Sequence, residues 1–184
     1  MSSAQTGGPR RGVPAPAGRI TEVAVTARGL DVTFRLKNDA DRAVHYIADV
    51  RTIRFDPGIG RLVVGLSDEG RVLLPSMANI HPNFKVVDPG SEAELKLTLP
   101  LQIRKLADAP APDGSVAFES QDLTSATEIV VEVAWSDTPF YGDPRPTDTE
   151  RMPTEAWALG KVVMAAAGPG KPRGDEPVRE VSRS

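Results

Sequence analysis

The sequence predicts an all-β fold, an antiparallel sandwich of about seven to nine short strands. In residues 30–37 and 128–135, apolar side chains occupy every second position: Leu30, Val32, Phe34, Leu36, Ile129, Val131, Val133 and Trp135. This alternation is typical of a strand with one buried face, and such a face needs a second apolar layer to cover it. Almost no window has the period of a helix. We therefore expect the two stretches to be facing or neighbouring strands of one sandwich.

The composition favours one soluble, cytoplasmic domain without a nucleic-acid partner. The 184 residues include 22 Lys and Arg against 25 Asp and Glu, a formal charge of −3, and the two signs are interleaved. Such a chain has no basic patch for nucleic acid. The absence of cysteine excludes disulfides and thiol chemistry and suits a reducing compartment. No stretch has the roughly 20 apolar residues of a membrane span, and none has the apolar core of a signal peptide.

Both ends of the chain are expected to be disordered. Residues 1–18 consist largely of small residues, Pro and Arg, and residues 167–184 are charged and rich in Pro and Gly. Such segments bury too little apolar surface to offset the entropy of ordering. The sequence therefore predicts a single β-sandwich domain over residues 19–166, between an N-terminal arm and a C-terminal tail.

The first elements of the domain follow in order from alternation and turn residues. Residues 20–27 and 30–37 alternate on either side of a Gly-containing turn, which indicates a hairpin. Residues 38–41 are a polar turn of the kind in which Asn and Asp side chains bond their own backbone. A long strand is expected over residues 43–55. Its alternation changes phase near Arg51-Thr52, which predicts a bulge.

The middle of the chain contains a second hairpin and a clear strand. Residues 61–66 and 71–74 flank a polar segment that ends in Gly70, and they are interpreted as the two strands of that hairpin. Residues 84–87 form a short apolar stretch before a Pro-Gly turn. Residues 92–99 alternate charged or Thr side chains with Ala and Leu, which predicts a strand with one buried face.

The later segments are less regular. Residues 101–107 fit either a strand or a single helical turn, and residues 116–118 fit a short edge strand. Residues 136–153 contain four prolines and are expected to form a long, stiffened loop, which is often a functional kind of segment. Residues 157–165 fit a closing strand or a helix, and the sequence leaves both open.

The alternation also predicts which side chains form the core. In each strand the residues of the apolar phase should face the second layer. Replacing one of them by Ala should therefore be costly. The predicted core contains Val25, Val32, Phe34, Leu36, Leu95, Leu97, Ile129, Val131, Val133 and Trp135.

The layout of these elements resembles bacterial immunoglobulin-like and fibronectin-III-like modules. A Leu/Val/Phe strand runs into an Asn-Asp turn, and the turn Asp88-Pro89-Gly90 leads into the strand over residues 92–99. The resemblance covers roughly residues 20–165 and lacks the Cys pair of antibody domains. It implies an immunoglobulin-like sandwich used for binding, scaffolding or assembly, and it implies no site residues.

No catalytic or cofactor motif is found in the sequence. There is no Gly-x-Ser-x-Gly, and Gly58-Ile59-Gly60 lacks the Lys and helix of a phosphate loop. His45 and His81 are the only histidines, and a metal site would need them to converge with a carboxylate. The turn Asn38-Asp39-Asp41 lacks the oxygen spacing of a calcium loop. We therefore expect no enzyme, no cofactor and no metal site.

Two surfaces are expected to bind a partner. The predicted hairpin within residues 62–74 is apolar on both faces, so that Val63 and Leu73 need a covering loop or another chain. Phe140 and Tyr141 lie in the Pro-stiffened loop, where rigid aromatic side chains either cap the core or anchor a partner at little entropic cost. The predicted partner-binding residues are Val63, Leu73, Phe140 and Tyr141.

These observations favour a non-catalytic protein interaction or assembly module that binds a protein partner or associates with itself. The first alternative is a β-sandwich that binds a small ligand or metal ion at a loop end. The second alternative is an accessory subunit of an enzyme. The fold prediction and the absence of catalytic motifs together favour the interaction module.

Overall fold

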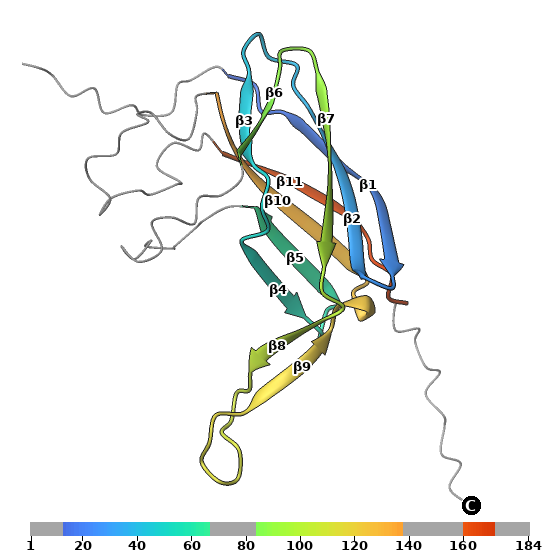
Figure 1. Cartoon of the computed structure of the whole chain (residues 1–184), viewed down its shortest axis with the longest axis vertical. Coiled ribbons are helices and arrows are strands. Elements are labelled where there is room, and N and C mark those ends of the chain that lie inside the picture. Colours follow the sequence, from blue (N-terminus) through green and yellow to red (C-terminus); the bar gives the residue numbers. More distant parts are fainter. Residues whose placement is uncertain (1–12, 67–83, 138–159, 172–184) are drawn as a thin grey trace, which may run out of the picture.

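The computed structural model describes residues 13–66, 84–137 and 160–171. These residues form eleven strands and one turn of 3-10 helix, arranged in three sheets (Figure 1). The all-β prediction is confirmed, and the number of strands exceeds the predicted number. Within these residues no helix is long and apolar enough to cross a membrane.

Sheet A contains three strands, β1 (Ala17–Thr26), β2 (Gly29–Lys37) and β7 (Glu92–Leu99), with β2 in the middle. Both pairs are antiparallel. The structure thus confirms the first hairpin and the strand over residues 92–99. A register shift between Ile20 and Glu22 marks a bulge in β1.

Sheet B is built around β10 (Glu128–Ser136). β11 pairs along one side of β10, while β5 and then β3 share its other side. β4 flanks β5, and β6 flanks β3. The strands around β10 are β3 (Val44–Ile47), β4 (Thr52–Asp56), β5 (Arg61–Leu66), β6 (Phe84–Val87) and β11 (Gly160–Ala167).

Two features of sheet B differ from the expectation or decide an open choice. β5 and β10 are parallel, whereas every other strand pair of the described residues is antiparallel. The long stretch of chain between these two strands permits a parallel pair, because it can return to the same end of the sheet. β11 shows that residues 160–167 form a strand and not a helix.

Sheets A and B pack face to face, and the core lies between them. Most of the predicted core is buried there: Val32, Phe34, Leu36, Leu97, Ile129, Val131, Val133 and Trp135. Leu95 is only partly buried, and Val25 is 50% exposed, so that the prediction is wrong for Val25. Val25 lies near the end of an edge strand, where a side chain has neighbours on one side only.

Residues 43–55 form two strands instead of one long strand with a bulge. β3 ends at Ile47, and β4 begins at Thr52. β3 pairs with β6 and with the end of β10, whereas β4 pairs with β5. The change of phase in the sequence therefore marks the point where the chain exchanges one set of neighbours for another.

Of the hairpin predicted between residues 61–66 and 71–74, the structure describes only the first strand, β5. β5 pairs with β4 along one edge and with β10 along the other. A strand has two hydrogen-bonding edges, so neither edge of β5 is left for residues 71–74, which lie outside the described residues. The hairpin partner of β5 is β4.

A third sheet forms a hairpin arm that stands away from sheets A and B (Figure 1). The arm consists of β8 (Gln102–Leu106) and β9 (Phe118–Asp122), which pair with each other. β8 decides the open choice over residues 101–107 in favour of a strand. The short edge strand expected at residues 116–118 begins at Phe118 and continues to Asp122. The 3-10 helix η2 (Leu123–Ser125) then connects the arm to β10.

Asn38 joins three segments of chain at one end of the two layers. Its buried side-chain amide donates to the C=O groups of Arg42 and Val87, at 2.6 and 3.0 Å. Its Oδ1 accepts a hydrogen bond from the N–H of Ala40 at 3.0 Å, which confirms the predicted polar turn. Because a buried polar group is costly when unpaired, these bonds fix the ends of β2 and β6 relative to each other.

Candidate functional site

Three large apolar side chains are exposed at the outer end of the β8–β9 arm. Leu106, Val116 and Phe118 have 60%, 65% and 57% of their surface exposed. Leu106 lies opposite Phe118 in the ladder, which continues with a 2.9 Å hydrogen bond between Ala107 and Ala117. Residues opposite each other share a face, so Leu106 and Phe118 lie side by side, and Val116 lies two residues before the start of β9.

A cation completes this surface. The guanidinium of Arg104 lies 5.7 Å from the centre of the Phe118 ring, close enough for a cation–π interaction. Arg104 precedes Leu106 by two residues on β8, which places it on the same face. The name arm face is used below for Arg104, Leu106, Val116 and Phe118.

The base of the arm is anchored in the core. Leu101 and Ile103 pack, partly buried, against the core cluster, and Leu123 is fully buried. The N–H of Leu123 donates to the C=O of Leu101 at 2.9 Å, which closes the base of the hairpin. The carboxylate of Asp122 accepts from the N–H of Thr124 and so caps η2. The exposure of the outer half is therefore not the result of a loose attachment.

The outer edges of β8 and β9 are unpaired within the described part of the chain. An isolated two-stranded hairpin is marginally stable in water because it buries little apolar surface. A free strand edge offers backbone N–H and C=O groups to another chain. The arm thus has both exposed apolar side chains and, within the described residues, unpaired backbone groups.

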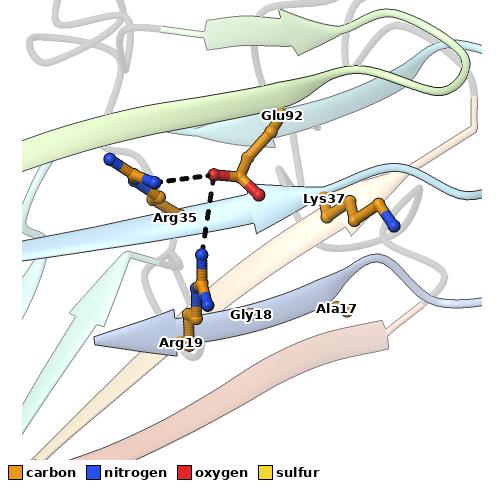
Figure 2. A pocket seen from close by; sticks show the side chains of 6 residues that line it. All are labelled: Ala17, Gly18, Arg19, Arg35, Lys37 and Glu92. Carbon is orange, nitrogen blue, oxygen red and sulfur yellow. Dashed lines mark hydrogen bonds and ion pairs between the residues drawn. The ribbon is translucent and has the colours of Figure 1, made fainter. Parts of the chain in front are cut away.

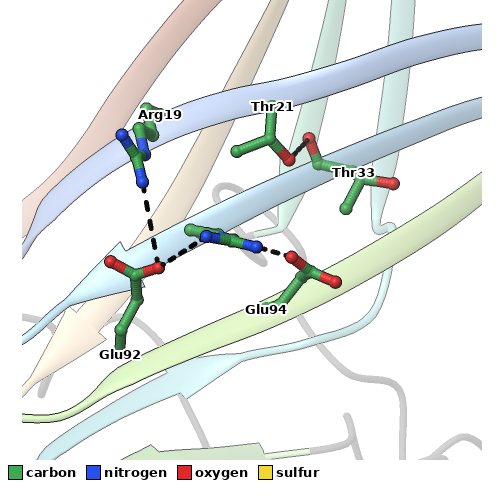
Figure 3. Close-up of polar contacts among 6 residues, drawn as sticks. Arg19, Thr21, Thr33, Glu92 and Glu94 are labelled. Carbon is green, nitrogen blue, oxygen red and sulfur yellow. Dashed lines mark hydrogen bonds and ion pairs between the residues drawn. The ribbon is translucent and has the colours of Figure 1, made fainter.

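The outer face of sheet A is charged and internally paired (Figure 3). Arg35 of β2 contacts Glu92 and Glu94 of β7 at 3.2 and 2.7 Å. Arg19 of β1 lies 4.0 Å from the same Glu92 oxygen. The hydrogen bond with Glu94 and its charge raise the pKa of Arg35. One network of ion pairs therefore runs across all three strands.

A second ion pair lies further along the same face. The ammonium of Lys96 is 2.8 Å from a carboxylate oxygen of Asp31, and the Thr98 hydroxyl donates to the other oxygen at 2.8 Å. The hydrogen bond from Lys96 is the main reason that the pKa of Asp31 lies below its usual range. These charges neutralise one another across the strands, which is typical of a solvated face.

A shallow groove of about 400 Å³ lies at one end of this face (Figure 2). The carboxylate of Glu92 points between the guanidinium groups of Arg35 and Arg19, and Lys37 is paired with Asp39 at 3.0 Å. The cations that an anionic ligand needs thus already contact carboxylates of the chain. The groove is lined by Ala17, Gly18, Arg19, Arg35, Lys37 and Glu92.

A second open hollow, of about 420 Å³, lies beside the turn at residues 57–60 and includes Lys171. The C=O of Gly60 accepts the N–H groups of Thr127 and Glu128, at 2.8 and 3.1 Å, so this turn is tied to the start of β10. Among the described residues, no group of three or more His, Asp or Glu side chains is placed to hold a metal ion.

Of the predicted partner-binding residues, the structure describes Val63 alone. Val63 lies on the outer face of sheet B, half-buried between Arg54 of β4 and Val130 of β10. Two ion pairs flank it, Arg54 with Glu132 at 3.5 Å and Arg61 with Glu128 at 2.5 Å. Leu73, Phe140 and Tyr141 lie outside the described residues.

The structure describes one of the two histidines. His45 is half-buried on β3, and burial lowers its pKa while the charge of Asp137 opposes that shift. His81 lies outside the described residues. The turn at Asn38-Asp39-Asp41 was considered as a calcium loop. Its side-chain oxygens contact other groups of the chain, since Asn38 bonds backbone groups and Asp39 pairs with Lys37.

Comparison with known proteins adds no relative. No protein-family model, curated protein or solved structure matches this chain. The arm face is therefore identified from exposure and geometry alone. Sequence reasoning did not single out its residues, because two short alternating segments around a Pro-rich loop do not reveal whether a second layer covers them.

Proposed function

We propose that this protein is a non-catalytic interaction or assembly module, built as an immunoglobulin-like β-sandwich, that binds a protein partner through the arm face. The observation that carries the proposal is the exposure of Leu106, Val116 and Phe118 on a hairpin that stands away from the core (Figure 1). Contiguous exposed apolar side chains mark protein contact sites, whereas scattered ones need no explanation.

The apolar exposure of the described residues is concentrated on the arm. The other strongly exposed large apolar side chains are scattered over separate elements: Val25, Ile59, Val86 and Val163. Full burial of each arm side chain on a partner would gain roughly 1.5–3 kcal/mol, before the cost of association is subtracted. The chemistry that fits the arm face is an apolar pocket on the partner, because the only cation of the face, Arg104, already stacks on Phe118.

Support for an immunoglobulin-like build comes from the arrangement of the sheets. Sheets A and B face each other over one apolar core, and hairpins connect β1 with β2 and β4 with β5. Modules of this build commonly serve in binding and assembly. The parallel β5–β10 pair differs from the antiparallel pairing of immunoglobulin-like modules.

The alternatives have weaker support. A ligand- or ion-binding sandwich would use the groove beside Glu92 or the hollow at residues 57–60. In both places charged side chains or backbone C=O groups already contact other groups of the chain. An accessory subunit of an enzyme is compatible with the arm face, since the enzyme would then be the partner.

The four residues singled out from the sequence, Val63, Leu73, Phe140 and Tyr141, stay in the proposal as a second contact surface. Val63→Lys and Tyr141→Ala, made separately, should each leave the thermal midpoint nearly unchanged. One of the two should abolish association in light scattering or pull-down. Unfolding of both variants, or normal association of both, would contradict this second surface.

The arm face is tested by Phe118→Asp. The variant should keep the thermal midpoint of the wild type, because Phe118 is exposed, and it should lose the partner in a quantitative pull-down from native lysate. Ile59→Asp is the matched control, since Ile59 is 63% exposed but lies in the turn between β4 and β5. A Phe118→Asp variant that captures the same proteins as Ile59→Asp and the wild type would overturn the proposal.

A further inference from the structure

The outer edge of β7 is free within the described residues. β7 is the last strand of sheet A, and no backbone hydrogen bond from a described residue reaches its side away from β2. The edge is eight residues long, from Glu92 to Leu99, longer than either strand of the arm. An edge of this length is a template for a further strand.

The hydrogen bonds next to β7 indicate which of its backbone groups point outward. The N–H of Asn38 donates to the C=O of Ser91 at 2.9 Å, so these two residues form a hydrogen-bonded pair at the start of the ladder. In an antiparallel ladder, such pairs alternate with pairs whose N–H and C=O groups face away. The backbone N–H and C=O groups that point to the free edge are therefore those of Glu92, Glu94, Lys96 and Thr98.

Sheet B extends one strand further than sheet A on this side. β1 lies against β11, where a Cβ added at Gly18 would clash with Val162 and Met164, so the two sheets are aligned at that border. Counted from that border, the described part of sheet A has three strands, whereas sheet B has four. The fourth strand of sheet B is β4 where β5 flanks β10, and β6 where β3 flanks β10. No described strand therefore occupies the position beside β7 that faces β4 and β6.

The burial of side chains near this position agrees with the count. Ile53 and Phe55 of β4 face the core side, since they lie opposite Val64 and Leu62, and both are only partly buried. Leu95 of β7 is also partly buried, whereas the core residues of β2 and β10 are almost completely inaccessible. An additional strand in sheet A would cover these three side chains.

Charge specifies the strand that fits. Glu92, Glu94 and Lys96 lie on the outer face of β7, opposite Lys37, Arg35 and Thr33 of β2. They already pair with Arg19, Arg35 and Asp31, yet each of the three side chains is still at least 37% exposed and can take a further contact from the free edge. An added antiparallel strand would meet the same three side chains from the other side. A segment that fits both faces of the sheet has basic residues opposite Glu92 and Glu94 and an acidic residue opposite Lys96. Between them it has apolar residues, which face the core.

We infer that the free edge of β7 binds an extended segment of a protein partner, which adds to sheet A as a fourth, antiparallel strand. The segment alternates apolar residues with one acidic and then two basic residues, in the direction from its N- to its C-terminus. This contact uses residues other than the arm face and does not depend on the role proposed for the arm. Backbone bonds supply part of its affinity, and the charges and the apolar side chains supply its register.

A peptide that copies residues 30–37 of the chain itself is the probe, because β2 already pairs with β7 in the required register. In the peptide the residue that corresponds to Thr33 is changed to Asp, which lies opposite Lys96. Titration of the full chain should shift the amide resonances of Glu92–Leu99 and the side-chain signals of Ile53 and Phe55. Shifts at β8 and β9 instead, or no shifts at millimolar peptide, would overturn the inference.

Charge reversal makes the test specific. Glu94→Lys should weaken the peptide by about tenfold, because attraction is replaced by repulsion. A peptide whose Arg35 position carries Glu should bind Glu94→Lys better than it binds the wild type, which a merely damaged fold could not produce. Glu119→Lys on the arm is the matched control and should leave the affinity unchanged. Equal binding of both peptides to Glu94→Lys would overturn the assigned register and with it the inference.

The same variants keep this inference separate from the proposed function. Phe118→Asp should leave binding of the peptide intact, and Glu94→Lys should leave capture through the arm face intact. Loss of the peptide in Phe118→Asp would show that the probe binds the arm and would overturn the β7 contact. Lys96→Pro, with Lys96→Ala as its control, removes an outward N–H and should weaken the peptide, because Pro is tolerated in a strand only where its nitrogen faces the free edge.

Discussion

β10 and the β8–β9 arm contain apolar residues at alternate positions, yet they lie in opposite environments. In β10, the side chains of Ile129, Val131 and Val133 are completely buried. On the arm, Leu106 and Phe118 have 60% and 57% of their surface exposed. The two regions differ in what surrounds them. β10 has paired neighbours on both edges and sheet A across the core, whereas the two strands of the arm pair only with each other in the described part of the chain.

This difference shows that alternation creates a potential apolar face but does not bury it. Burial requires a second layer, and the part of the chain described supplies that layer to β10 and not to the outer arm. The uncovered face is therefore the one available to another molecule. We expect the free energy of unfolding to depend on β10 and partner binding to depend on the arm. Four measurements test this difference.

The largest effect is expected at the covered strand. Val131→Ala and, on the facing sheet, Phe34→Ala should each lower the free energy of unfolding by about 2–5 kcal/mol, because each leaves a cavity in a packed core. Chemical denaturation followed by circular dichroism measures the loss. Denaturation curves like that of the wild type for both variants would contradict the core assignment.

The next effect is expected at the buried polar joint between the layers. Asn38→Ala should destabilise the fold by about 1–3 kcal/mol, because the C=O groups of Arg42 and Val87 lose their buried donor. Asp39→Ala is the control, since Asp39 is exposed and only pairs with Lys37 on the surface. Equal unfolding free energies for the two variants would show that the Asn38 hydrogen bonds do not hold the joint.

His45 is half-buried, and its titration should make the free energy of unfolding depend on pH. Burial lowers its pKa in the folded state below the ordinary value of 6.5, against the opposing charge of Asp137. The unfolded chain therefore binds a proton more readily, so this contribution is fully present above about pH 6.5 and is lost as the pH falls through the folded-state pKa. Thermal midpoints between pH 5 and 8 should fall less for His45→Gln than for the wild type. Parallel curves would contradict a lowered pKa of His45 in the folded state.

The smallest effect on stability is expected on the arm. Phe118→Ala should change the free energy of unfolding by no more than about 0.5 kcal/mol, because the ring is exposed and only stacks with Arg104. The same denaturation experiment that measures Val131→Ala checks it. A loss as large as that of Val131→Ala would mean that the arm is covered in solution, and the contrast with β10 would then fail.

The sequence was a good guide wherever the structure depends on neighbours along the chain. Alternation located β2, β7 and β10, and the turn residues located the first hairpin and the Asn38 turn. It also identified most of the core, because side chains of one phase must share a face. The phase change near residues 51–52 was a true signal, although it marked a break between β3 and β4 and not a bulge.

The sequence alone was therefore sufficient to locate the first hairpin and the strands β7 and β10, to assign most of their apolar faces, and to show the lack of known catalytic motifs, since these can be recognised from residue types and their spacing. The tertiary structure was needed to decide that β5 pairs with β4 and β10, that Val25 is exposed, and that no layer of described residues covers Leu106, Val116 and Phe118. The tertiary structure also decided that, among the described residues, sheet A has one strand fewer than sheet B beside β7. The physical reason is that strand pairing and burial depend on contacts between segments far apart in the chain, and local alternation is the same whether or not those contacts form.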